Sequence, residues 1–304
     1  MNGILPLWKP RGFTSHDCVM KIRRILKTKK VGHTGTLDPE VEGVLPLCIG
    51  QGTKIVPYLT DTEKTYIAEI TLGTATETED SHGNIIETKQ VNEHISLDKV
   101  LNTLDMFKGE ITQVPPMYSA VKVNGKKLYE YAREGEQVER PERKVTIHEL
   151  ELLNEHNENT YNVFKFRVIC SKGTYIRTLC VDIGKALGYP AHMSNLIRTK
   201  TGSFDKDNSF TFEVIEEAVS KGEVDPLLSP IQKGVDHLDV FYIDQSLVQK
   251  VRNGQKFPLP TKKLNTNPFR VQFEKELVAI YQINPKNENE IKPVRVFQVN
   301  TESR

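Results

Sequence analysis

Residues 32–39 bring a carboxylate, a histidine, two threonines and two glycines together in one short stretch, Gly-His-Thr-Gly-Thr-Leu-Asp-Pro. This composition is poor material for a helix or a strand and predicts a loop. Pro39 biases Asp38 away from the helical region, so the carboxylate is expected on an extended or turn backbone that can aim it at a ligand. An aspartate before a proline is also a common turn residue that bonds its own backbone, and the stretch alone leaves both interpretations open.

A run of basic side chains leads directly into this loop. Residues 21–30 contain six lysines and arginines and no acidic residue. Such a run is typical of a solvated helix face, but its position next to a glycine-rich loop favours binding of a polyanion. The net charge of the whole chain is only +1. The distribution of charge, rather than its sum, therefore favours a polyanionic partner.

Hydrophobic periodicity predicts the elements that must position these residues. Residues 3–8 predict a strand, and Thr14 or Ser15 caps a helix whose apolar positions recur at helical spacing as far as Leu26. Polar residues 74–84 predict a loop, and Asn124-Gly125 is a strong hairpin signal. Further strands are predicted at 44–50, 64–73, 145–153, 161–170 and 192–205. Further helices are predicted after caps at Thr53 and Ser96, at 126–133, after a turn at 171–174, and at 212–220.

The chain is longer than a usual single domain, with 304 residues, so one large domain and a small one are expected. After Val235 the pattern changes to short β-prone pieces at 240–243, 277–283 and 294–299, separated by polar turns. We therefore predict two domains, 1–235 and 236–304. The architecture is expected to be α+β, with a large sheet in the first domain.

Composition argues against several classes of protein. The four cysteines are far apart and form no Cys-x-x-Cys pair, so they are expected as buried free thiols, which fits the cytoplasm. The eight histidines lack metal-ligand spacing, and no metal site is predicted. The longest apolar runs have strand length, so neither a signal peptide nor a membrane span is predicted.

Five stretches carry a family resemblance. In chain order they are Lys9-Pro10-Arg11-Gly12, GHTGTLDP at 32–39, Lys64-Thr65-Tyr66, Ser119-Ala120-Val121-Lys122 and CSKGTYIRTL at 170–179. Together they resemble the tRNA pseudouridine-55 synthases of the TruB family, from Lys9 to about Phe204. Three glutamates depart from the residues usual in that family, namely Glu40, Glu42 and Glu77.

The resemblance implies a fold and a reaction. The fold is the pseudouridine synthase fold, with a large mixed, mainly antiparallel sheet flanked by helices and a small β-rich, PUA-like, RNA-binding C-terminal domain. The reaction isomerises uridine-55 in the T-loop of tRNA, so that C5 of uracil replaces N1 at C1′. Positive character at C1′ calls for a nearby carboxylate, and Asp38 is the implied catalytic residue. Nucleophilic attack by Asp38 and a glycal-type route both remain open.

The resemblance also assigns roles to other residues. Arg177 is the implied cationic partner of Asp38, and side chains more than about 8 Å apart would contradict that pairing. Tyr66 is the residue on which the flipped base stacks, and His33 fills the space that the base vacates. Further pocket residues are Lys9, Tyr175 and Leu196. Phosphate contacts are expected from Lys21, Arg23, Arg24, Lys27, Lys29, Lys30 and Lys122.

The expected partner is the T-arm of tRNA, with no protein partner evident, no membrane and a monomeric chain. No cofactor is required, because the isomerisation is redox-neutral and the chain has no glycine-rich nucleotide-binding loop. Two rival hypotheses are a chaperone that opens and recloses the tRNA elbow, and an RNA-binding protein without catalysis. Asp38→Asn separates these readings, because only an enzyme would lose its product while still binding tRNA.

Overall fold

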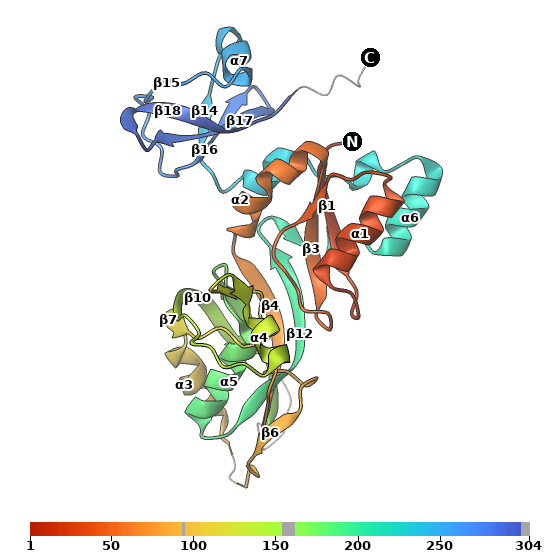
Figure 1. Ribbon diagram of the computed structural model, residues 1–304, viewed down its shortest axis with the longest axis vertical. Helices are drawn as coiled ribbons and strands as arrows, with labels where there is room; N and C mark the ends of the chain where they lie inside the picture. The colour runs from red at the N-terminus through yellow and green to blue at the C-terminus, as the bar shows by residue number, and fades with distance from the viewer. Residues whose placement is uncertain (93–94, 154–161, 299–304) are drawn as a thin grey trace.

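The computed structural model describes residues 1–92, 95–153 and 162–298. The molecule is elongated, with a small β module of residues 240–296 at one end and the hairpin of β5 (Thr74–Thr76) and β6 (Ile85–Thr88) near the other (Figure 1). The N-terminus lies next to the small module. Within the described residues no helix is long and apolar enough to cross a membrane.

Nine strands form the large sheet, in the order β1-β3-β12-β4-β11-β10-β7, with β2 paired to β3 and β13 paired to β12. The pairs are antiparallel except for β12 and β3, which are parallel. The predicted mixed, mainly antiparallel sheet is confirmed. Its strands are β1 (Gly3–Lys9), β2 (Val31–His33), β3 (Glu42–Ile49), β4 (Lys64–Leu72), β7 (Gly109–Gln113), β10 (Arg143–Leu152), β11 (Val163–Cys170), β12 (Ala191–Thr201) and β13 (Phe204–Asp205).

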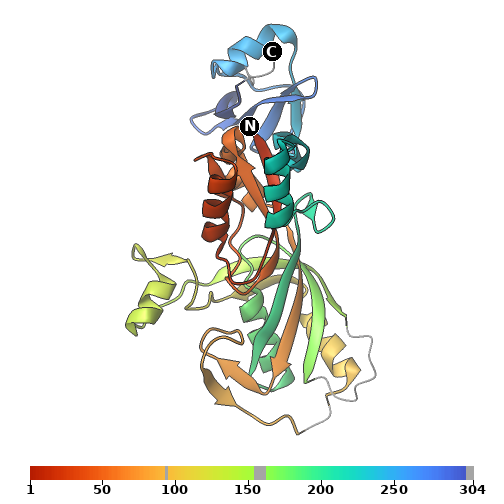
Figure 2. The ribbon, with the colours of Figure 1, turned by 90° about the vertical axis from the view of Figure 1, so that its right-hand side faces the viewer.

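Helices flank both halves of this sheet. Two of them, α1 and α6, lie beside β1 and β3, whereas α5 packs on β12 and α3 packs on α5 and β10 (Figures 1 and 2). The helices are α1 (Ser15–Ile25), α2 (Val56–Thr60), α3 (Leu97–Met106), α4 (Leu128–Glu134), α5 (Ile176–Leu187), α6 (Phe212–Lys221) and α7 (Gln245–Arg252), with 3-10 turns η1 (Gly50–Ile55), η2 (Asp225–Leu227) and η3 (Ile231–Val235).

The central strands form the core because apolar residues alternate along them. In β4 the buried positions Tyr66, Ala68, Ile70 and Leu72 alternate with half-buried ones, and in β11 Phe164, Phe166, Val168 and Cys170 are buried. Both strands were predicted, and their faces follow from a period of two, which places alternate side chains on one side of a sheet. Tyr161, the first residue of the second predicted strand, lies outside the described residues.

Two short hairpins extend from the sheet, β5 (Thr74–Thr76) with β6 (Ile85–Thr88) and β8 (Lys122–Val123) with β9 (Lys126–Lys127). The β8–β9 hairpin forms at Asn124-Gly125 as predicted, and both residues have positive φ, as a two-residue turn requires. With α4 it forms an arm that projects from the body (Figure 2).

The small module is a separate five-stranded sheet with strand order β14-β16-β17-β18-β15. Its strands are β14 (Val240–Tyr242), β15 (Phe257–Pro258), β16 (Phe269–Phe273), β17 (Glu276–Asn284) and β18 (Asn287–Val296). The predicted β-rich C-terminal part is therefore present, and α7, β15 and β16 are additions that the sequence did not predict. Residue 299, at the end of the last predicted strand, lies outside the described residues.

Several local predictions were wrong, among them the start of the helix predicted at 126–133, because Lys126 and Lys127 form β9. Thr53 does not cap a helix, because its hydroxyl donates to the Gly50 carbonyl inside η1 and α2 begins only at Val56. The loop predicted from residue 32 begins later, since β2 extends to His33 by pairing with β3. The loop predicted at 74–84 begins with β5, whose threonines pair with β6 across the turn.

Candidate active site

Asp38 lies on the loop between β2 and β3, and three side chains from outside the loop form hydrogen bonds with its backbone. Ser15, at the start of α1, accepts the Leu37 N–H at 2.8 Å. The buried Lys9 ammonium donates to the Pro39 carbonyl at 2.9 Å, and Arg198 Nη2 donates to the Gly35 carbonyl at 3.2 Å. The loop backbone is therefore fixed, while the Asp38 side chain remains 41% exposed.

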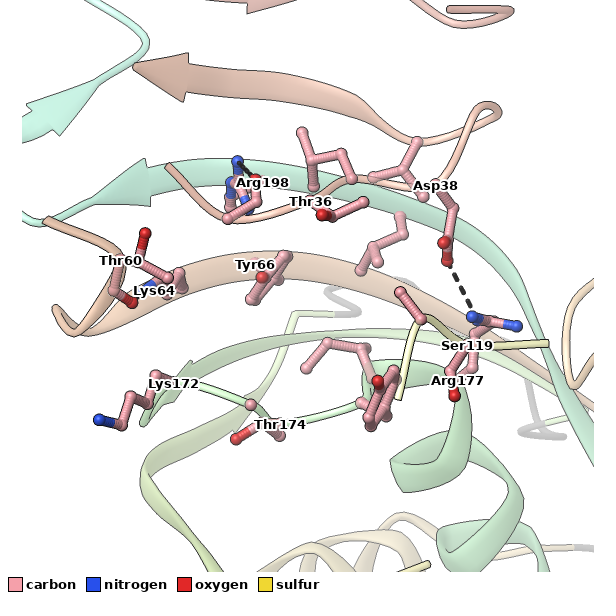
Figure 3. A pocket seen from close by; sticks show the side chains of 18 of the residues that line it. Thr36, Asp38, Thr60, Lys64, Tyr66, Ser119, Lys172, Thr174, Arg177 and Arg198 are labelled. Atoms are coloured by element: carbon pink, nitrogen blue, oxygen red, sulfur yellow. Dashed lines mark hydrogen bonds and ion pairs between the residues drawn. The ribbon is translucent and has the colours of Figure 1, made fainter. Parts of the chain in front are cut away.

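Arg177 pairs with Asp38. Its Nε lies 3.1 Å from Asp38 Oδ2, within the limit that the pairing requires, and the arginine side chain is only 5% exposed. Its Nη1 donates to the Thr78 carbonyl at 2.8 Å and its Nη2 to the Tyr118 carbonyl at 2.9 Å. Because all three nitrogens are engaged, the guanidinium is held in one orientation beside the carboxylate (Figure 3).

A pocket of about 250 Å³ opens beside this pair. Its lining includes Asp38, Tyr66, Tyr175, Arg177 and Leu196, so five of the predicted residues meet in one cavity. Tyr66 lies between the Asp38 end and the opposite end of the cavity, where Lys64 and Thr60 are found (Figure 3). Burial raises the pKa of the Tyr66 phenol, which keeps its hydroxyl protonated.

Tyr175 is held through its backbone. The side chain of Gln113, at the end of β7, accepts the Tyr175 N–H at 3.0 Å and donates to the Tyr175 carbonyl at 3.1 Å. The Arg143 guanidinium lies 5.1 Å from the centre of the Tyr175 ring. These contacts fix the start of α5, on which Arg177 is the second residue.

Lys9 and His33 do not line the pocket. Lys9 is fully buried under the Asp38 loop, and burial lowers its pKa. His33 ends β2, where burial lowers its pKa, and its Nδ1 has no hydrogen-bond partner among the described residues. Lys9 thus supports the loop, and His33 lies on the strand that leads into it.

The basic residues of 21–30 divide into two groups. Lys21 lies 3.2 Å from Glu216 and over the Phe212 ring, and Arg23 donates to the Val31 carbonyl at 3.1 Å. The others are exposed, namely Arg24, Lys27, Lys29 and Lys30, as is Lys122 on the β8–β9 hairpin.

The structure adds two buried cations that the sequence analysis did not assign to the site. Lys64 lines the pocket and is 6% exposed, and burial lowers its pKa to about 8. Arg198 lines it at 1% exposure and donates to the Val44 carbonyl at 2.8 Å. Strand alternation could have indicated both, because Lys64 shares a face with Tyr66, and Arg198 shares one with Leu196.

Possible metal ligands and the cysteines were located in the described residues as well. In the described part of the chain no group of three or more histidine, cysteine, aspartate or glutamate side chains could hold a metal ion. The four cysteines are free and buried. Burial raises the pKa of the Cys18 and Cys170 thiols to about 11, so they are protonated at neutral pH.

Comparison with known proteins gives matches along nearly the whole chain. Residues 23–176 match the family model described as "TruB family pseudouridylate synthase (N terminal domain)" and residues 177–236 match "tRNA pseudouridylate synthase B C-terminal domain". The tRNA pseudouridine synthase B of Oceanobacillus iheyensis is 58% identical over 98% of this chain and 98% of its own length. That of Bacillus subtilis is 52% identical over 99% of both.

Solved structures match as well. "Structure of H/ACA RNP bound to a substrate RNA containing 2'-deoxyuridine" has a TM-score of 0.75 at 26% identity, covering 98% of this chain and 86% of that one. "Crystal Structure of a Cbf5-Nop10-Gar1 Complex" has a TM-score of 0.72 at 30% identity, covering 98% and 84%. The predicted fold class is confirmed.

Proposed function

The chain belongs to the TruB family of pseudouridylate synthases, and on that premise we propose that it isomerises uridine-55 in the T-loop of tRNA, with Asp38 as the catalytic residue. Its curated relatives are tRNA pseudouridine synthases that it matches over nearly their full length, so the chain is a tRNA-modifying isomerase. The observation that carries the finer proposal is the Asp38–Arg177 ion pair in the lining of a pocket that also contains Tyr66.

The proposed chemistry follows from the order of groups in the pocket. The target uridine leaves its stack and its base lies against Tyr66, with Leu196 as an apolar neighbour. Breaking the N1–C1′ bond builds positive character at C1′, which the Asp38 carboxylate stabilises by charge or by a covalent bond. The uracil then turns, C5 bonds to C1′, and the proton lost from C5 is balanced by one gained at N1.

Arg177 keeps the carboxylate charged when RNA covers the pocket. A carboxylate that loses water favours its neutral form unless a cation or hydrogen bonds compensate. The guanidinium supplies that cation in a fixed orientation, since its other nitrogens are held by the Thr78 and Tyr118 carbonyls. The pocket therefore suits an ionised Asp38 in the RNA complex.

The remaining assignments concern RNA binding. We propose that His33 occupies the place of the flipped base, that Lys9 supports the loop, and that Lys122 and the exposed basic residues of 21–30 contact T-arm phosphates. Residues 1–235 form the catalytic domain and residues 236–304 a small RNA-binding domain. Action as a monomer is part of the same proposal. The free buried thiols favour the cytoplasm.

The test is conversion of a T-arm minihelix, followed by mapping of pseudouridine by position. Wild-type protein is expected to modify the T-loop uridine, and Asp38→Asn to lower the rate at least about 10³-fold while binding the minihelix. The exposed Asp207→Asn is the matched control. If wild-type protein refolds tRNA but leaves its uridine unchanged, the chaperone hypothesis replaces this one.

A further inference from the structure

The Ser119 hydroxyl is buried in the pocket and bonds to no other described residue. Ser119 is 6% exposed and lines the cavity, and its Oγ has no hydrogen-bond partner among the residues that the structure describes. A second hydroxyl of the same cavity differs, because Thr174 Oγ1 donates to the Ser171 carbonyl at 2.9 Å. A buried hydroxyl without a partner costs free energy, and a substrate that enters the pocket can supply one.

The backbone holds Ser119 at the Asp38 end of the pocket. The carbonyl of the preceding residue, Tyr118, accepts from Arg177 Nη2 at 2.9 Å. Ser119 N–H donates to the Met117 carbonyl at 3.0 Å, and the Ser119 carbonyl accepts from Tyr129 in α4 at 3.1 Å. These bonds place Ser119 beside Arg177 and Asp38, away from the end where Lys64 and Thr60 lie (Figure 3).

The position of the reacting bond decides which part of a nucleotide meets this hydroxyl. If Asp38 acts at C1′, the ribose lies at the Asp38 end of the pocket, whereas the base lies over Tyr66 towards the other end. The 2′-hydroxyl is on the carbon next to C1′ and is both a donor and an acceptor, as a serine hydroxyl is. The two groups are therefore complementary.

We propose that the Ser119 hydroxyl binds the 2′-hydroxyl of the target uridine and makes the pocket prefer ribose to deoxyribose there. This inference rests on the proposed function, since it takes the place of the ribose from the role of Asp38. Ser119 is then a specificity residue, and the Arg177 contact with Tyr118 couples its position to that of the carboxylate. The uracil carbonyls and the neighbouring phosphates are the competing partners.

The experiment measures binding in an Asp38→Asn background, where no reaction disturbs equilibrium. Two T-arm minihelices are compared, identical except that one carries 2′-deoxyuridine at the target position. The parent is expected to bind the deoxy form roughly three- to tenfold more weakly, the effect of one neutral hydrogen bond. Adding Ser119→Ala is expected to bring the ratio of the two dissociation constants close to one.

Thr174→Ala is the matched control, because it removes a hydroxyl from the same pocket that already has a protein partner. It is expected to keep the parent's ratio. Ser119→Cys is the second variant, because a thiol has a similar volume but is a weak hydrogen-bond donor and acceptor. If Ser119→Ala fails to fold, Ser119→Cys must lower the ratio of the two dissociation constants. A ratio that stays at the parent's value in the Ser119 variants overturns the proposal and assigns the hydroxyl to the base or a phosphate.

Conversion of the ribose minihelix by wild-type protein separates this outcome from failure of the proposed function. If pseudouridine forms and the Ser119 variants keep the parent's ratio, only the Ser119 inference is wrong. If no pseudouridine forms, the proposed function is wrong and the inference falls with it.

Discussion

Arg177 is the residue that joins the parts of the site. Its guanidinium contacts Asp38 on the β2–β3 loop, Thr78 in the turn after β5, and Tyr118 on the segment that leads to the projecting arm. A lysine could not make these contacts together, because its donors radiate from one nitrogen whereas the planar guanidinium presents several in fixed directions. The carboxylate, the turn and the arm are therefore positioned by one side chain.

A different residue gives a prediction for pH. Burial lowers the Lys64 pKa from 10.5 to about 8, so between these pH values the unfolded chain holds a proton that the folded chain does not. Stability contributed through Lys64 therefore rises with pH across this window, by up to about 3 kcal/mol. The difference in the free energy of unfolding between wild type and Lys64→Met should therefore change by about that amount in favour of wild type as the pH rises. Urea unfolding of both proteins at pH 8 and pH 10.5 measures it.

The exposed Lys99→Met is the control, because it removes an ammonium group that stays in water. A difference between wild type and Lys64→Met that stays constant over the window would show that Lys64 keeps its ordinary affinity for protons. Lys64 Nζ also donates to the Thr60 and Thr62 carbonyls, and because the ammonium and the neutral amine both carry N–H groups, the Met variant loses these bonds at both pH values.

At the scale of elements, the Asp38 loop is held by residues from α1, β1 and β12. The loop backbone is hydrogen-bonded by the side chains of Ser15, Lys9 and Arg198. All three residues lie outside the loop in the sequence. Loops carry function when a rigid scaffold fixes them. The orientation of the Asp38 side chain therefore depends on elements that are distant in the sequence.

Ser15→Ala tests this dependence. The substitution leaves the Leu37 N–H without its acceptor in a buried position, and we expect a loss of about 1–3 kcal/mol in the free energy of unfolding. Because Leu37 precedes Asp38, kcat should fall while tRNA binding is largely kept. Denaturant unfolding and single-turnover kinetics measure the two effects.

Ser220→Ala is the matched control for that experiment. Ser220 is exposed at the end of α6, so its loss should change stability by less than about 0.5 kcal/mol and leave kcat unchanged. A Ser15 variant that is destabilised yet fully active would show that the Asp38 loop keeps its geometry without this bond.

Local signals explain what the sequence could predict at this scale. Thr14 caps α1 with a reciprocal bond to Asp17, three residues away, and Asn124-Gly125 makes its hairpin from its own turn conformation. The role of Gln113 could not be predicted in this way. Its side chain reaches Tyr175, 62 residues away, only because β7 pairs with β10 in the folded sheet. The pairing of Arg177 with Asp38 came from the family resemblance and not from local pattern.

The sequence analysis also failed to predict elements that contain few apolar residues. The strand β7, Gly-Glu-Ile-Thr-Gln, has one apolar residue and exists because it pairs with β10 at the sheet edge. In the small module α7 follows an Asp244 cap within a stretch that contains only three apolar residues. Tertiary pairing, rather than propensity, decides such segments.

At the scale of the whole molecule, the small module is packed onto the part that contains the large sheet. Leu277, Ile280 and Phe297 belong to one apolar cluster with Ile4 and Val44 of the large sheet. Polar bonds surround the cluster: Lys54 donates to the Val296 carbonyl at 2.6 Å, and Gln51 and Gln298 exchange two bonds of 2.8 Å. This contact fixes the second proposed RNA-binding surface relative to the pocket.

Phe297→Ala is expected to separate the two parts. Phe297 is 4% exposed, and truncating a buried phenylalanine costs about 3–5 kcal/mol. Because this loss falls on the contact between the parts, calorimetry should show two melting transitions where wild type shows one. Affinity for full-length tRNA should fall more than kcat on a T-arm minihelix, since the pocket itself is unchanged.

Tyr242→Ala, which removes an exposed ring from the same module, is the control and should keep one transition. A single transition in Phe297→Ala, lowered in temperature, would mean that the remaining contacts suffice to couple the parts.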